Sequence, residues 1–126
     1  MSRRHLLVVA TVLAAILAAG AVADGKTAPK PKYYKTVKIG DNFYTPAKVT
    51  VKPYTKVTWR WPSLASGGGD THDVKFRKGP KGVPHYQSEP AAADYRYAKL
   101  LTKVGTYKIV CTFHEGEMTQ TIVVKK

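Results

Sequence analysis

One short stretch of the chain holds three side chains that can bind a transition metal. His114 lies three residues after Cys111, and Met118 lies four residues after His114. His72, in an earlier part of the chain, offers a second imidazole. A thiolate and two imidazoles in a trigonal plane, with a weak axial thioether, suit copper in both oxidation states. These types and spacings predict one mononuclear copper site, although zinc also accepts cysteine and histidine ligands.

The surrounding pattern predicts that Cys111 and His72 both face the interior. Cys111 continues an apolar alternation that begins at Tyr107, and His72 begins one that runs to Phe76. Because side chains alternate between the faces of a strand, Asp73 and the basic residues on the same phase are expected outside. A buried thiol or a lone inward histidine is ordinary in a core. Two of them close to a loop with further donors favour a metal site.

The rest of the chain alternates with a period of two, which is typical of half-buried strands. No helix-length apolar period follows residue 23, apart from a short turn expected around residues 91–93. About seven short strands separated by turn residues predict an all-β, antiparallel sandwich or Greek-key barrel. The alternating runs are residues 37–39, 48–52, 56–61, 72–77, 95–97 and 107–111, with a last strand from about Thr119 to Val124.

The N-terminus has the features of an export signal. Arg3 and Arg4 precede an apolar run, and the small residues around Val22 fit a cleavage site. We therefore predict a signal peptide over residues 1–23, a Lys- and Pro-rich tether over 24–33, and one domain over 34–126. An uncleaved membrane anchor and a twin-arginine export signal are the alternatives. The expected location is periplasmic, cell-surface or secreted.

The net charge indicates which classes of partner the chain can bind, and the cysteine count indicates the role of its one thiol. The chain has 21 basic and 8 acidic residues, a net charge of +13. An exported protein meets anionic walls, lipids and acidic proteins instead of nucleic acid, so a solvated basic surface or attraction to such partners is expected. The single cysteine, Cys111, cannot form an internal disulfide, which favours a role as a metal ligand. We expect a monomer.

The order of several motifs resembles the cupredoxin family of small blue-copper proteins, of the plastocyanin, amicyanin and pseudoazurin type. The likeness extends from about residue 35 to residue 124. It rests on the segments Asn42-Phe43-Tyr44-Thr45-Pro46, Val57-Thr58-Trp59, Thr71-His72-Asp73-Val74, Gly105-Thr106-Tyr107, Cys111-Thr112-Phe113-His114 and Met118-Thr119.

The resemblance implies a Greek-key β-sandwich of about seven to eight strands. It implies that His72, Cys111 and His114 are equatorial copper ligands and Met118 the axial one. The implied function is electron transfer between Cu(I) and Cu(II), with a redox protein partner that is acidic or membrane-associated, and not enzymatic catalysis. The alternative is an extracytoplasmic copper carrier, buffer or resistance protein without redox turnover.

Two departures from the family pattern lie next to the predicted ligands. Asp73 stands where the family often has Asn or Thr, and we expect it to accept a hydrogen bond from Thr112 and to lower the potential by favouring Cu(II). Glu115 and Glu117 flank Gly116 just before Met118. Glu117 is expected either to crowd the axial side or to point to solvent.

Three other residues have simpler interpretations. His85 lies in a Pro- and Gly-rich stretch and is predicted to be a solvated loop histidine. Trp59 and Trp61 share the inward phase of their strand. They are predicted to be core aromatics, with an electron-relay role as the less favoured alternative.

Overall fold

The structure is a computed structural model that describes Gly20 and residues 25–126. Apart from Gly20, the predicted signal peptide lies outside these residues. Within the described part, no helix is long and apolar enough to cross a membrane. The elements are β1 (Tyr33–Gly40), β2 (Phe43–Thr45), β3 (Lys48–Val51), β4 (Thr55–Arg60), the 3-10 turn η1 (Leu64–Ser66), β5 (Lys75–Lys78), β6 (Arg96–Leu101), β7 (Gly105–Val110) and β8 (Thr119–Val124).

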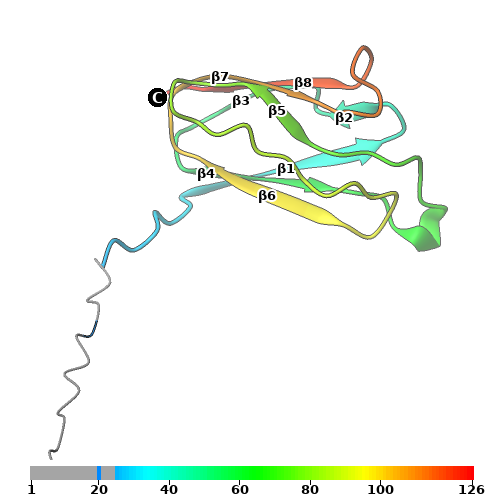
Figure 1. Ribbon diagram of the computed structural model, residues 1–126, viewed down its shortest axis with the longest axis horizontal. Coiled ribbons are helices and arrows are strands. Elements are labelled where there is room, and N and C mark those ends of the chain that lie inside the picture. The colour runs from blue at the N-terminus through cyan, green and yellow to red at the C-terminus, as the bar shows by residue number, and fades with distance from the viewer. Residues whose placement is uncertain (1–19, 21–24) are drawn as a thin grey trace, which may run out of the picture.

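The strands form two four-stranded sheets that face each other (Figure 1). One sheet has the order β2-β1-β4-β6 and the other the order β3-β8-β7-β5. This confirms the predicted all-β Greek-key sandwich. The expected antiparallel pairing holds for four strand pairs, but β1 pairs with β4 and β3 pairs with β8 in parallel. The chain changes sheets between β2 and β3, so β4 returns beside β1 in the same direction.

The core follows the period-two pattern of the sequence. In β4, Val57 and Trp59 are fully buried, and the ring of Trp59 lies edge-on to that of Phe76 with centroids 5.7 Å apart. The indole N–H of Trp59 donates to the side-chain oxygen of Gln120 at 2.8 Å, so its one polar atom is satisfied. Trp61 is also buried. Both tryptophans are therefore core aromatics, as predicted.

The segment before β5 departs from the predicted strand. The strand begins at Lys75, and His72 instead forms an isolated bridge with Ala91. His72 is buried as expected, but Asp73 is buried too, with 1% of its surface exposed. The expectation that Asp73 lies on the outer face is therefore wrong. Its backbone is outside the regular ladder, and its carboxylate is satisfied by hydrogen bonds described below.

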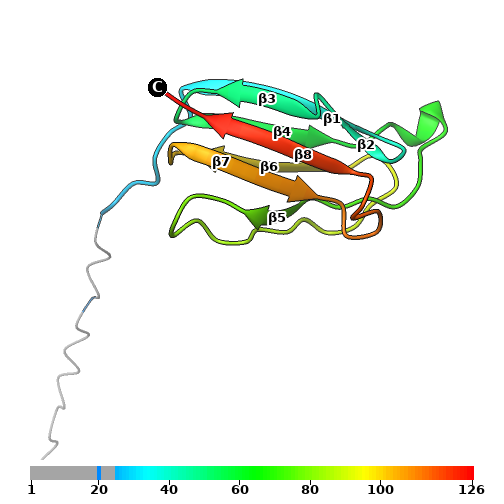
Figure 2. The same cartoon turned by 90° about the horizontal axis from the view of Figure 1, so that it is seen from above.

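The two ends of the sandwich are formed by different strand ends and loops. Figure 2 shows that the C-terminus and the segment before β1 leave from the same end. The turn between β1 and β2, the start of β5 and the β7–β8 loop lie at the other end, as the strand registers require. Gly25 to Lys30 are exposed, and Tyr33 is already the first residue of β1. In place of the turn expected at residues 91–93, the 3-10 turn is at Leu64–Ser66.

Candidate metal centre

The loop between β7 and β8 places Cys111 and His114 close together. It closes where the amide of Cys111 donates to the carbonyl of Met118 at 3.0 Å. Inside it, the amide of His114 donates to the carbonyl of Cys111 at 3.2 Å, and that of Met118 to the carbonyl of His114 at 2.9 Å. The loop is thus two successive turns on the end of a β-ladder, which fixes the directions of its side chains.

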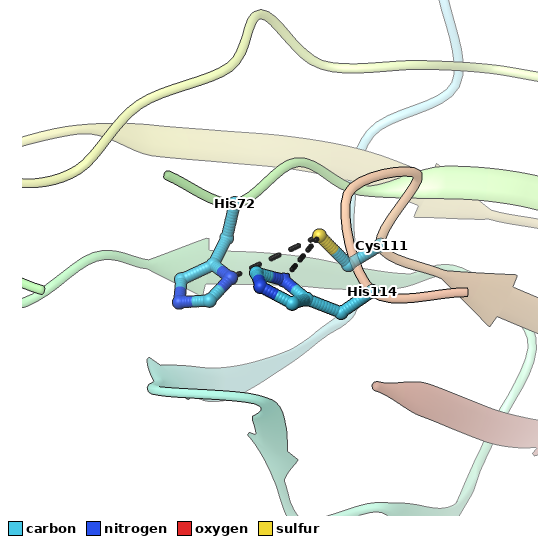
Figure 3. A group of neighbouring side chains, drawn as sticks. All are labelled: His72, Cys111 and His114. Carbon is cyan, nitrogen blue, oxygen red and sulfur yellow. Dashed lines mark hydrogen bonds between the residues drawn. The ribbon is translucent and has the colours of Figure 1, made fainter. Parts of the chain in front are cut away.

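Three donor groups meet at this end of the sandwich. The Cys111 Sγ atom lies 3.8 Å from Nδ1 of His72 and 3.7 Å from Nδ1 of His114 (Figure 3). The two imidazole rings have centroids 5.0 Å apart. One donor atom from each residue lies within 4.8 Å of those of the other two. One small ion can therefore contact all three groups.

Burial makes this a dry site with one partly open side. Cys111 is fully buried and His72 is 1% exposed, whereas His114 is half-buried. Burial raises the pKa of the Cys111 thiol, and hydrogen bonds from the backbone of Asp73, Phe113 and His114 act in the opposite direction. A metal that binds here must displace the thiol proton.

Met118 lies at the base of the same loop and is fully buried. Its amide and carbonyl both bond to the loop, to His114 and Cys111. Its position is therefore tied to those of the two loop donors. A buried methionine on the same loop as Cys111 and His114 adds a thioether to the kind of donor set that a copper ion accepts.

Asp73 joins the two parts of the chain that supply the donors. Its carboxylate accepts from the amide of Thr112 at 2.7 Å, from the hydroxyl of Thr112 at 2.7 Å and from the side-chain amide of Gln87 at 2.9 Å. The expected bond from Thr112 is therefore present, and it is doubled. The backbone carbonyl of Asp73 also accepts from the Tyr44 hydroxyl at 2.6 Å. The two bonds from Thr112 hold the His72 segment to the β7–β8 loop, and the bonds from Gln87 and Tyr44 tie it to two other parts of the chain.

A second carboxylate, Asp41, contacts the outer nitrogen of His72. Its Oδ1 atom is 3.3 Å from Nε2 of His72 and accepts from the amide of Asp70 at 2.9 Å. The Asp70 amide and the His72 ring hold the pKa of Asp41 below its usual range. A proton on Nε2 leaves Nδ1, the nitrogen that faces Cys111, free to bind a metal.

The acidic residues before Met118 do not enter the site. Glu115 and Glu117 are both exposed, and Glu115 forms an ion pair with Arg77 on the surface. Of the two expectations for Glu117, the solvent-facing one is confirmed. His85 is exposed in its loop, as predicted for a solvated histidine.

Sequence reasoning missed two contributors to the site. The strand pattern and the spacing of the donors single out neither Asp41, which lies in the turn Gly40-Asp41-Asn42, nor Gln87. Asp41 is 31 residues from His72 and Gln87 is 14 from Asp73, so neither contact has a local signal. The Gly40-Asp41-Asn42 turn offered the one indication, since a turn at a strand end can bring a carboxylate to the end where ligands gather.

A dry thiolate between two imidazoles, with a thioether on the same loop, fits copper better than a hard ion that prefers oxygen. The molecule is thus a small β-sandwich protein with one mononuclear metal centre at one end. The family model of copper-binding proteins of the plastocyanin/azurin family matches residues 32–125, so the chain belongs to that family. It binds one copper ion per chain.

Solved structures of amicyanin are similar to this chain. A reduced proline-to-phenylalanine variant is 28% identical, with a TM-score of 0.61, over 83% of this chain and 87% of that one. Amicyanin from Paracoccus versutus is 27% identical, with a TM-score of 0.61, over 75% of this chain and 84% of that one. A proline-to-glycine variant in a reduced Cu(I) form is 26% identical, with a TM-score of 0.60, over 83% and 87%. No curated protein matches the chain significantly.

Proposed function

We propose that the protein is a one-electron carrier whose copper ion is held by His72, Cys111, His114 and Met118. The observation that supports this best is the approach of two imidazole Nδ1 atoms to within 3.8 Å of a buried Cys111 Sγ atom. Copper, when bound, supplies the couple between Cu(I) and Cu(II). The chain is proposed to act as a carrier and not as an enzyme.

The donors are held by a frame that resists rearrangement. The β7–β8 ladder closes the loop through the bond between Cys111 and Met118, and Asp73 bonds the loop to the His72 segment. The indole of Trp61 also donates to the carbonyl of His72 at 3.3 Å. A site whose ligands move little between two oxidation states needs little reorganisation, which favours fast electron transfer.

We propose that electrons enter and leave through His114. Its ring is half-buried, whereas His72 and Cys111 are closed off from solvent. Phe113, the residue before it, is 54% exposed and gives this part of the surface an apolar character. A partner that docks here can approach the ring of a metal ligand directly.

The relatives support a redox role. Amicyanin variants are described in reduced and in oxidised states, and one in a Cu(I) form at pH 4. By analogy, we propose that this chain cycles between the same two states. The partner is then a redox protein, acidic or membrane-associated. We also propose export of a monomer, with residues 1–23 as a cleaved signal peptide, 24–33 as a tether and 34–126 as the copper domain.

Repeated reduction and reoxidation of the copper-loaded protein tests this function. We expect a single reversible one-electron wave whose amplitude persists over many cycles. His114→Ala should abolish it, while His85→Ala, which removes an exposed histidine outside the site, should leave it unchanged. Tight Cu(I) binding without reversible oxidation would instead support the copper carrier.

A further inference from the structure

The charge of the molecule is unevenly distributed along the sandwich. Seven of the 8 acidic residues lie in the described part, and all seven are at the copper end. Asp41 and Asp73 contact the donor segments, and Asp94 bonds to Pro62, which follows the end of β4. Glu89 follows Ser88, whose amide donates to the carbonyl of Val74. The seven are Asp41, Asp70, Asp73, Glu89, Asp94, Glu115 and Glu117.

At the opposite end of the sandwich, every charged side chain among the described residues is basic. This end is formed by the start of β1, the β3–β4 turn, the β6–β7 turn and the end of β8, which strand pairing brings together. We call this surface the basic end. It consists of Lys32, Tyr33, Tyr34, Lys52, Tyr54, Lys103, Val104, Lys125 and Lys126, all of which are exposed.

The basic end also exposes aromatic rings. Tyr34 is 73% exposed, Tyr33 44% and Tyr54 37%. The ammonium groups of Lys52 and Lys32 lie over the rings of Tyr33 and Tyr54, at 5.5 and 5.1 Å from the centroids. Tyrosine and lysine together are typical of a membrane–water interface, where an apolar body enters the lipid and a polar tip stays in water.

We propose that the basic end binds the surface of an anionic lipid bilayer. Clustered lysines near such a surface each contribute attraction, and the exposed tyrosines add contact with the interface. A purely anionic polymer would use the lysines but has no need of the rings. The Lys-containing segment from Gly25 to Lys32 leaves from this same end and adds further positive charge (Figure 1).

Binding by the basic end determines which way the copper centre faces. β1 has 8 residues and runs from the basic end to the turn that holds Asp41, a length of about 26 Å at ~3.3 Å per residue. The copper end would therefore point away from the lipid, open to a partner. This inference rests on charge and exposure and does not depend on the redox function.

Vesicle binding by the copper-loaded chain from residue 24 tests the proposal. Among the residues that the structure describes, the buried core residues all lie between Val37 and Val124, so this chain contains that core. We expect co-sedimentation with vesicles of phosphatidylcholine plus phosphatidylglycerol, little with phosphatidylcholine alone, and a steep loss with added salt. Reduction of the bound protein by ascorbate should proceed at the rate in solution, because the copper end is free. Slowed reduction would overturn the orientation.

Two triple variants with the same net charge distinguish the basic end from charge in general. Replacing Lys52, Lys125 and Lys126 by Gln should weaken binding by about fivefold for each lysine. Replacing the exposed Lys38, Lys48 and Lys108 by Gln should change it by less than about twofold. Equal losses in the two variants, or no binding to anionic vesicles, would overturn the proposal.

The tyrosines are tested separately. Tyr34→Ser should weaken vesicle binding without changing its salt dependence, whereas Leu64→Ser, at an exposed apolar position of the copper end, should have no effect. Retention on soluble polyglutamate without vesicle binding would assign the basic end to an acidic polymer and refute the lipid surface. A visible spectrum of each variant establishes that its copper site, and hence its fold, is intact.

Discussion

The buried carboxylate of Asp73 links the metal site to both of the segments that form it. It accepts three hydrogen bonds, two from Thr112 and one from Gln87. Asp73→Asn keeps the shape of the side chain, but its NH₂ group then faces at least one of these hydrogen-bond donors and cannot accept from it. We expect a loss of about 1–3 kcal/mol in the free energy of unfolding. The reduction potential should rise, because the negative charge that favours Cu(II) is gone.

The matched control is Asp94→Asn. It removes the same charge at the same end, from an exposed carboxylate that bonds only to the Leu64 amide among the described contacts. Urea unfolding and a redox titration on both variants give the two readouts. An unchanged potential in Asp73→Asn would refute the electrostatic role of this residue.

Asp41 orients the imidazole of His72 through its outer nitrogen. Asp41→Ala removes the acceptor and should lower copper affinity by about tenfold to a hundredfold, the usual cost of losing such a partner. Asp41→Asn keeps an acceptor oxygen and should retain most of the affinity. Competition with a chelator of known affinity measures both. Equal affinities for the Ala variant and the unaltered protein would contradict the orienting role.

At the scale of the elements, the glycine that begins β7 and the glycine in the loop after β7 tolerate an added side chain very differently. At Gly105 the backbone φ is 142°, and an added Cβ would lie 2.6 Å from Cγ of Pro80. At Gly116, in the loop that follows β7, nothing lies within 4 Å of an added Cβ. Gly105→Ala should destabilise the fold by about 1–3 kcal/mol, and Gly116→Ala by less than ~0.5 kcal/mol. A large thermal shift in Gly116→Ala would mean that the loop is packed more tightly than described.

The short strand β2 makes the fold sensitive to alkali through Tyr44. Its hydroxyl is buried and donates to the carbonyl of Asp73, and burial raises its pKa well above the usual range. An unfolded tyrosine ionises near pH ~10, so the contribution of neutral Tyr44 is complete below ~10 and is lost as the pH rises further.

Tyr44→Phe should therefore cost about 1 kcal/mol at neutral pH, for the lost hydrogen bond, and lose less stability than the unaltered protein above pH ~10. Unfolding in urea at several pH values measures both effects, and Tyr34→Phe controls for the loss of an exposed hydroxyl. Parallel pH profiles for the Tyr44→Phe variant and the unaltered protein would contradict the role of burial.

At the scale of the whole molecule, features with a local period could be predicted from the sequence. Cys111 lies just beyond β7, yet it keeps the inward phase of Tyr107 because the same core lies beneath both. His72 is inward for the same reason, although its segment is not a regular strand. The alternation placed Asp73 on the outer face, but Asp73 is buried, because a carboxylate can be buried wherever enough hydrogen-bond donors surround it.

Features that depend on how distant strands pair could not be predicted. The parallel pairs β1–β4 and β3–β8, the contact between Asp41 and His72, and the gathering of lysines at one end all follow from topology and register. A net charge of +13 indicated a basic protein. It did not indicate that the acidic residues gather around the copper site and leave the other end exclusively basic.

The central claim is that Cys111 and two histidines hold one copper ion in a trigonal thiolate site. The visible spectrum of the Cu(II)-loaded protein tests it most directly. We predict an intense thiolate-to-copper band at ~600 nm that disappears in Cys111→Ser and is unaffected in His85→Ala. A copper-loaded, folded protein without that band, or a band that survives Cys111→Ser, would contradict the claim.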